Sequence, residues 1–430
     1  MIGAARGARA QQARAVEARG QRVRARLVMS VGWRLALLTV LVGSTALYVL
    51  AIPHTHGLLF DFKGGLYNAG RAIIHGHSPY QPAFLAHQAA IIRAGGIAQG
   101  ETPQHAFSIP VYPAPANLAV IPLSLLPFWL AGTLYTLLCV AAMILGLRLL
   151  GVSDWRCIAL ALVSWPFAFG LDLGAVGPLL VLGAGIAWRW RAQLWPPALA
   201  IAALVVTKIF PWPLCVWLLI TRRFRTLALT AAIVAVATLA AWAAIGFDGF
   251  AQYPQMLANL SFIQEGRATS LVAVLLAVGL PAGAAGAVAL GTAAAMLGLA
   301  WRIARRPGGE RKAFGLAIFA ALTATPIVWD HYMVLLFVPI ALASPRRSAI
   351  WFLPLCTPLV IVTSAALVPL SSRFNIAHPD TLRSAVLWLV LEGLVVAKLC
   401  FNERSEFRAV RSRLRFGRRR TPTGASIKGV

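Results

Sequence analysis

Long apolar blocks, separated by short polar or basic segments, dominate the pattern along this chain. Four of the clearest blocks are residues 33–52, 227–245, 284–299 and 350–368. Their lengths approach the roughly 20 apolar residues that a helix needs to cross a bilayer core. The blocks show no period-2 alternation of polar and apolar residues, and in lipid only helices or closed barrels satisfy every backbone group. The pattern therefore predicts an all-α polytopic membrane protein.

Following the apolar blocks through the chain predicts about twelve transmembrane helices, within a range of about 10 to 13. Several segments are short unless tilted or shielded by neighbours, so the number stays open. Residues 117–150 form either one helix kinked at Pro127 or two helices, and residues 271–280 are either re-entrant or interfacial. The predicted passes are residues 33–52, 117–150, 157–169, 176–188, 195–206, 211–220, 227–245, 284–304, 313–325, 332–343, 350–368 and 384–400.

These passes make one transmembrane domain, residues 33–401, between basic tails at 1–32 and 402–430. The first apolar run is too long for a signal peptide, and no small-residue cleavage site follows it, so we expect a retained span. The largest loop, residues 53–115, holds two stretches with roughly helical spacing of apolar positions, and we expect them to be amphipathic helices in the membrane interface.

Charge decides the orientation. The chain is only 12% charged, about half the value of a soluble domain, yet its formal charge is +26. With both termini in the cytoplasm, 32 of the 39 basic residues fall on the inner side, as the positive-inside rule requires. The Arg-rich tails have few interleaved aromatics, so anionic membrane lipids, and not nucleic acid, are the expected partner. The seven outer basic residues are Lys63, Arg71, Arg93, Lys208, Arg267, Arg373 and Arg383.

The predicted outer face collects the chemically versatile side chains. All eight histidines and seven of the thirteen acids fall there or at its edge. The pairs His54/His56 and His75/His77 have a spacing that suits a strand, and no carboxylate pattern completes a ligand set, so no metal or cofactor is expected. Five scattered cysteines show no redox or metal spacing. We therefore expect an active site at the outer surface of the cytoplasmic membrane, with Glu392 inside the last span serving packing.

Three motifs, in this order, resemble a known family. They are residues 61–71 (DFKGGLYNAGR) continuing through 75–80, residues 112–115 (YPAP), and residues 325–332 (TPIVWDHY). Together with the threading they are similar to glycosyltransferase family 87, of the GT-C superfamily of multi-helix transferases that use polyprenyl-phosphate sugars. Relatives in this family include polyprenol-phosphate-mannose-dependent α-mannosyltransferases. The resemblance spans residues 61–345.

The chain departs from the family pattern at three places. Tyr112-Pro-Ala stands where the family often has Tyr-Pro-Pro, and residues 174–177 (GAVG) stand where it often has Gly-Gln-x-Asn. An Asn-x-Ser-Leu motif is reduced to residues 268–271 (ATSL). These departures bear on the identity of the sugar more than on the reaction class.

The resemblance implies that Asp61 is the general base that deprotonates an acceptor hydroxyl. The alternative is an N-cap, because Asp61 precedes a predicted short helix. His331 is implied as a group that holds the departing phosphate, since anions need cations or hydrogen-bond donors. The alternative is a histidine of the aromatic belt between Trp329 and Tyr332.

Lys208 is the further candidate for the phosphate, because an unpaired ammonium in an apolar stretch is costly. The alternative is an anchor that snorkels to the interface. Arg267 and Arg373 are candidates by charge and side alone. The candidate substrate-binding residues are five aromatic residues of the three motifs, Tyr67, Tyr80, Tyr112, Trp329 and Tyr332.

The resemblance thus implies an inverting, metal-independent hexosyltransferase, with mannose as the first candidate sugar. It would move the sugar from a polyprenyl-phosphate donor to a lipid or glycan acceptor. The alternative is a transporter or a flippase for lipid-linked sugars. Such folds often have two similar halves with broken helices at the midplane. No internal repeat of that kind is found in the sequence.

Overall fold

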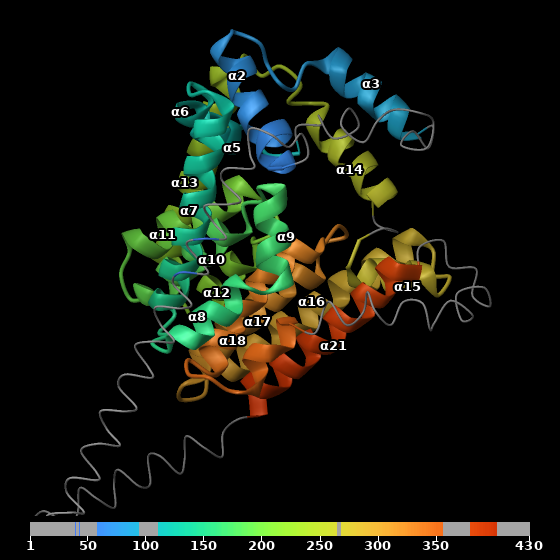
Figure 1. The fold of residues 1–430 in the computed structure, drawn as a ribbon. Coiled ribbons are helices and arrows are strands. Elements are labelled where there is room, and N and C mark those ends of the chain that lie inside the picture. Colours follow the sequence, from blue (N-terminus) through green and yellow to red (C-terminus); the bar gives the residue numbers. More distant parts are fainter. Residues whose placement is uncertain are drawn as a thin grey trace, which may run out of the picture. The chain divides into compact units, whose positions relative to one another are not determined.

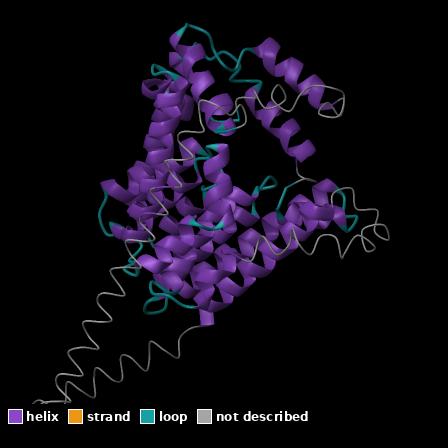
Figure 2. Ribbon diagram, in the orientation of Figure 1, coloured by secondary structure: helices purple, strands orange, loops and turns teal. Residues whose placement is uncertain are grey.

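The computed structural model describes residues 58–93, 111–264, 268–355 and 379–401, with Thr39 and Gly43 as isolated positions. Every element within these residues is helical, and Figure 2 shows only helices and loops there. The all-α prediction is confirmed for this part of the chain. Apart from Thr39 and Gly43, the predicted first span lies outside the described residues, as do the two basic tails and residues 356–368 of the predicted pass at 350–368.

Figure 1 labels the α-helices along the chain. In order, the described helical elements are η1 (Asp61–Tyr67), α2 (Asn68–Ile74), α3 (Pro82–Arg93), α5 (Ala114–Ala119), α6 (Ile121–Ser124), α7 (Phe128–Leu149), α8 (Trp155–Leu162), α9 (Trp165–Leu173), α10 (Gly177–Arg189), α11 (Trp195–Thr207), α12 (Pro213–Ile220), α13 (Phe224–Ala244), α14 (Tyr253–Gln264), α15 (Leu271–Ala277), α16 (Ala282–Ala304), α17 (Gly309–Thr323), η3 (Asp330–Leu336), α18 (Phe337–Ala343), η4 (Ala349–Leu355) and α21 (Pro379–Phe401).

Among the described helices, α7, α13 and α16 are each long and apolar enough to cross a membrane. Helices α8 and α9 meet at a break with a bend of 53° and would make a fourth span if they form one. Helix α11 and the continuous segment Asp330–Ala343 are apolar but shorter. These apolar helices support a membrane protein, whereas the predicted number of about twelve passes is not confirmed.

Proline sets the break that the sequence predicted between residues 117 and 150. Pro127 has extended backbone angles (φ −56°, ψ 143°) and directly precedes α7, while the short helices α5 and α6 come before it. Proline cannot donate a backbone hydrogen bond and restricts the residue before it. The two stretches predicted as amphipathic helices in the first loop are also helical, as η1 with α2 and as α3.

The core of the bundle depends on close helix packing. Helices α7 and α10 meet at Gly146 and Gly185, where an added Cβ at Gly185 would lie 2.7 Å from the Gly146 carbonyl oxygen. Small residues allow such backbone contact in membrane proteins. Helix α17 is the most enclosed element, since every residue from Ala313 to Thr323 is buried. It packs against α16, α12, α18 and α21.

Two arginines and a glutamate from three segments meet at one end of the bundle. The carboxylate of Glu310, in the first turn of α17, lies 2.5 Å from Arg223 Nη2 and 3.5 Å from Arg191 Nε. Arg191 follows α10, and Arg223 follows α12. Segments that the charge pattern assigned to the cytoplasm therefore lie together, and we call this place the arginine end.

Four helices run from the arginine end to a second region of the bundle, which is formed by their opposite ends. Helix α10 begins at Gly177, α11 ends just before Lys208, α12 begins at Pro213 and α17 ends at Thr323. Their other ends lie beside the arginine cluster. With a rise of 1.5 Å per residue, a helix as long as α10 separates its two ends by about 20 Å. We call this second place the site end.

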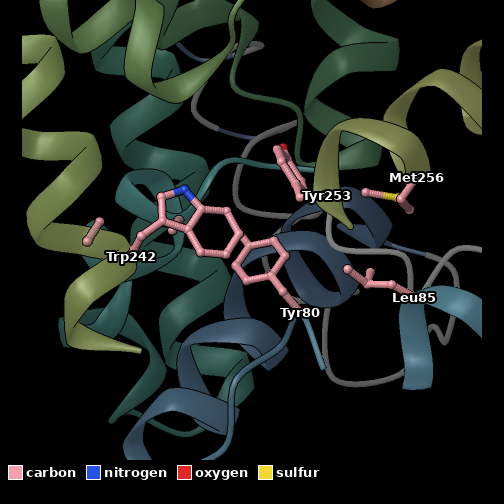
Figure 3. Close-up of a cluster of buried hydrophobic side chains, with 7 residues drawn as sticks. Tyr80, Leu85, Trp242, Tyr253 and Met256 are labelled. Atoms are coloured by element: carbon pink, nitrogen blue, oxygen red, sulfur yellow. The ribbon is translucent and has the colours of Figure 1, made fainter. Parts of the chain in front are cut away.

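A buried aromatic cluster holds α3 and α14 against the end of α13 (Figure 3). The Tyr80 ring lies 4.7 Å from the Trp242 ring and 5.3 Å from the Tyr253 ring, measured between centroids. Leu85 of α3 and Met256 of α14 complete the same cluster. The first loop is therefore anchored to a segment some 160 residues further along the chain, counted from Tyr80 to Trp242.

The turn after α9 fixes the start of η1. Gly174 adopts φ +70°, and its missing Cβ would lie 2.7 Å from Phe62 Cβ and 3.2 Å from Leu59 Cα. The Leu59 amide also donates to the Asp172 carbonyl oxygen at 2.7 Å. Two segments that the threading assigned to the same side of the membrane are therefore in direct contact.

We expect Gly174→Ala to destabilise the folded protein by about 1–3 kcal/mol, because alanine disfavours this backbone conformation and its methyl would overlap Phe62. The matched control is Gly298→Ala in α16, where an added Cβ meets no atom within 4 Å. The control should be neutral or slightly stabilising. Thermal unfolding in detergent measures both, and equal melting temperatures would contradict the packing described for this turn.

Candidate active site

Asp61 is the first residue of η1 and is half-buried. The N-cap position of η1 belongs to Phe60, so Asp61 stands inside the first turn and not at the cap that the sequence offered as an alternative. The next residue, Phe62, is fully buried and stacks on the Tyr135 ring at 4.1 Å between centroids. Gly65 lets the helix approach the Tyr112 ring, which a Cβ there would meet at 3.0 Å.

Lys208 enters the same place from α11. The helix ends at Thr207, and Lys208 has extended angles (φ −143°, ψ 126°) that turn the chain toward α12. Its Nζ donates a hydrogen bond to Tyr332 Oη at 2.6 Å. The same Nζ lies 4.5 Å from the Tyr112 ring centroid and 4.7 Å from that of Tyr332. The ammonium is therefore held between two aromatic faces, which attract a cation.

The positive charge of Lys208 acts on the Asp61 carboxyl. Burial raises the pKa of Asp61 above its ordinary value, and the positive charge of Lys208 lowers it in turn. Burial also raises the pKa of Tyr112 well above its ordinary value, and the negative charge of Asp61 raises it further. Tyr112 thus keeps its proton.

His331 lies on the neighbouring segment and is buried, with 4% of its surface exposed. Within the described residues, neither of its ring nitrogens has a hydrogen-bond partner. Its ring centroid is 4.7 Å from that of Tyr332, and Gly170 leaves room for its Cβ. Burial, and then the charge of Lys208, lower the pKa of His331 well below its ordinary value. The ring is therefore a neutral donor and acceptor, and not a cation.

The reduced family motif at residues 268–271 holds the segment that leads to His331. The Thr269 amide and hydroxyl both donate to the Val328 carbonyl oxygen, at 2.6 and 2.8 Å. The Ser270 hydroxyl donates to the Pro326 carbonyl oxygen at 2.7 Å and accepts from the Ala273 amide, capping α15. The motif lacks the asparagine of the family pattern but still clamps this turn.

Two of the candidate substrate residues have structural partners. The Tyr67 hydroxyl donates to the Leu126 carbonyl oxygen at 2.8 Å. The Tyr80 hydroxyl donates to the Tyr112 carbonyl oxygen at 2.5 Å and accepts from Asn117 Nδ2 at 2.6 Å. Tyr80 thus supports the residue whose ring faces Lys208. Their contact with a substrate stays a prediction.

The structure brings together Asp61, Lys208, Tyr112, His331 and Tyr332 from four separate parts of the chain. Trp329 lies half-buried at the start of η3, whereas Arg267 and Arg373 lie outside the described residues. Within those residues no three side chains of His, Cys, Asp or Glu form a metal-binding group. The cluster combines a proton acceptor with an ammonium, two phenols and an imidazole. The cluster can therefore accept a proton from a hydroxyl group and bind an anion next to that group.

Sequence reasoning missed Asp330, which occupies the variable position of the Trp-x-His-Tyr motif. Its carboxylate accepts hydrogen bonds from two tryptophans, Trp165 and Trp388. The signal that could have found it is a carboxylate directly before a candidate site histidine.

Comparison with protein families matches residues 111–328 of the chain to glycosyltransferase family 87. No curated protein and no solved structure matches the chain. Lys208 and Tyr112 lie inside the matched segment, whereas Asp61 and His331 lie outside it. Because the match covers just over half of the 430 residues, and all described elements are helical with apolar spans, the chain belongs to glycosyltransferase family 87.

Proposed function

We propose that this glycosyltransferase moves a hexose, with mannose as the first sugar to test, from a polyprenyl-phosphate donor to a lipid or glycan acceptor. The observation that carries the proposal is that the Tyr112 ring contacts both η1, at Gly65, and the Lys208 ammonium, so that the charge of Lys208 acts on the half-buried Asp61 carboxyl. A general base and a cation for a phosphate are the two groups that this reaction needs. Asp61 lies at the start of η1 and Lys208 follows the end of α11. The Tyr112 residue contacts both of these segments.

In the proposed step, Asp61 takes the proton from an acceptor hydroxyl. The hydroxyl oxygen forms a bond to the anomeric carbon on the face opposite the phosphate. The bond from that carbon to the phosphate oxygen breaks, and its electron pair stays with the polyprenyl phosphate. The configuration at the anomeric carbon is therefore inverted.

Three donors would stabilise the departing phosphate. Lys208 supplies a positive charge, Tyr332 a hydroxyl already in contact with that ammonium, and His331 a ring N–H without another partner. Hydrogen bonds from ionised donors are the strong ones, and fixed donors act best where water is excluded. Arg267 and Arg373 remain further candidates on sequence grounds. No step requires a metal.

We further propose a GT-C-like bundle of about twelve spans in the cytoplasmic membrane, with the site end facing outward and both termini inside. The separation of the arginine end from the site end supports this orientation, because arginine clusters favour the cytoplasmic side. The donor's lipid tail would then lie between helices within the bilayer.

We expect Asp61→Asn to lower kcat by about 10²- to 10⁴-fold, the usual contribution of a general base, with little change in KM. The assay incubates the purified protein with labelled polyprenyl-phosphate mannose, and then with other polyprenyl-phosphate hexoses, in the presence of membrane lipids. The matched control is Asp248→Asn, an exposed carboxyl in the loop after α13, which should transfer sugar at the wild-type rate.

Equal product from the wild type and Asp61→Asn would remove Asp61 as the base. A wild-type protein that transfers no sugar from any of these donors would contradict the proposed donor class.

We expect Lys208→Met to move the acidic limb of the kcat/KM profile to higher pH. Asp61 must be ionised to act, so activity falls as pH falls through the pKa of Asp61. Lys208 holds that pKa down, and its removal raises it. The pH profile of residual transfer, compared with that of Lys208→Arg, measures the effect.

The control for this experiment is Lys63→Met. Lys63 is two residues from Asp61, but its Nζ lies 4.9 Å from the centroid of the Phe128 ring, and it is not a cause of the shift at Asp61. Its acidic limb should match the wild type. An unmoved limb in Lys208→Met, or the same movement in Lys63→Met, would separate Lys208 from the base.

A further inference from the structure

Asp330 links three separate parts of the chain. One carboxylate oxygen, Oδ1, accepts a hydrogen bond from Trp388 Nε1 at 3.0 Å, and the other, Oδ2, accepts one from Trp165 Nε1 at 3.3 Å. Trp165 is the first residue of α9, and Trp388 lies within α21 and is fully buried. Each oxygen of one half-buried carboxylate therefore holds an indole from a different helix.

This arrangement provides hydrogen-bond partners for polar groups whose burial without a partner would cost free energy. A buried indole N–H needs an acceptor, and a carboxylate in apolar surroundings needs donors. The two tryptophans lie 165 and 58 residues from Asp330 along the chain. The carboxylate thus connects the start of η3 to α9 and α21, two helices that are distant from it in the sequence.

The tether acts on the residues that follow it. His331 and Tyr332 come next in the chain, and the Tyr332 amide donates to the Trp329 carbonyl oxygen at 2.8 Å, across Asp330. The His331 ring has no hydrogen bond of its own among the described residues. Its direction is therefore set by packing against Gly170 and the rings of Tyr332 and Phe169, and by the backbone at Asp330.

We propose that Asp330 is the positioning residue of the transfer site. Through Trp165 and Trp388 it holds the first turn of η3 so that His331 and the Tyr332 hydroxyl face Lys208. This inference rests on the proposed function for its kinetic consequence, but the tether itself is independent of the reaction. Asp330 is not assigned a contact with substrate.

Hydrogen–deuterium exchange tests the tether without any substrate. In Asp330→Asn and in Trp388→Phe, amides of residues 329–336 should exchange at least about tenfold faster than in the wild type, the factor that the loss of one hydrogen bond to a charged group implies. The matched controls are Asp248→Asn and Trp129→Phe, whose side chains are exposed. Neither control should alter exchange in this segment.

Transfer kinetics test the positioning role. Asp330→Asn should lower kcat per folded molecule by about 100-fold, the usual effect of a small misplacement, with KM and the acidic limb set by Asp61 little changed. In a His331→Ala background, Asp330→Asn should cause a clearly smaller further loss than in the wild type, because the part of its effect that acts through His331 is already gone and only the part through Tyr332 remains. Trp388→Phe should show the same dependence and serves if Asp330→Asn does not fold.

Unchanged exchange in both Asp330→Asn and Trp388→Phe would overturn the proposal. It would also be overturned if the loss of kcat in the double variant of His331→Ala with Asp330→Asn equalled the product of the two single losses. Faster exchange in a protein that transfers no sugar from any polyprenyl-phosphate donor would support the tether and contradict only the proposed function. A loss of folded protein with normal kcat in the folded fraction would reduce Asp330 to a purely structural role and overturn the positioning claim.

Discussion

The separation of charge along a shared set of helices is the constraint on which the rest of the structure depends. Helices α10, α11, α12 and α17 each have one end beside the Arg191–Glu310–Arg223 cluster and the other at the site end. A helix in lipid cannot place charge in its middle without cost, so the charged groups collect at its ends. The same helices that fix the arginine cluster therefore also carry Lys208, which lies over the rings of Tyr112 and Tyr332, and the start of α10 at Gly177, which packs against η3.

Within the site end, burial and neighbouring charges shift the pKa values of Asp61, Tyr112 and His331. Burial pushes the Asp61 carboxyl toward its neutral form, and Lys208 opposes that effect. Lys208 in turn adds to the burial that keeps the His331 ring neutral. A base that is only partly stabilised as an anion can accept a proton, and a neutral ring can donate to an arriving phosphate. These properties follow from the geometry of one cluster, and no single residue has them alone.

The sequence predicted the features that have local or charge-based causes. Proline predicted the break at Pro127, apolar blocks predicted the helices, and the charge pattern grouped the segments that meet at the arginine end. Asp61, Lys208 and His331 were found as candidates, and the structure gathers them. The supporting contacts could not be found, because the Tyr80 hydroxyl binds the backbone of Tyr112 and the Asp330 partners are distant tryptophans. Short helices such as α12 also leave the number of spans beyond what hydropathy can count.

The central claim is that the site end and the arginine end face opposite sides of the membrane. Single cysteines placed at His77 and Ser153 in a cysteine-free background test it most directly, because both positions are exposed, one in the first loop and one beside Arg148. A membrane-impermeant thiol reagent applied to intact cells should label the cysteine at position 77, and should label that at position 153 only after permeabilisation. Labelling of both from outside, or of position 153 alone, would contradict the account.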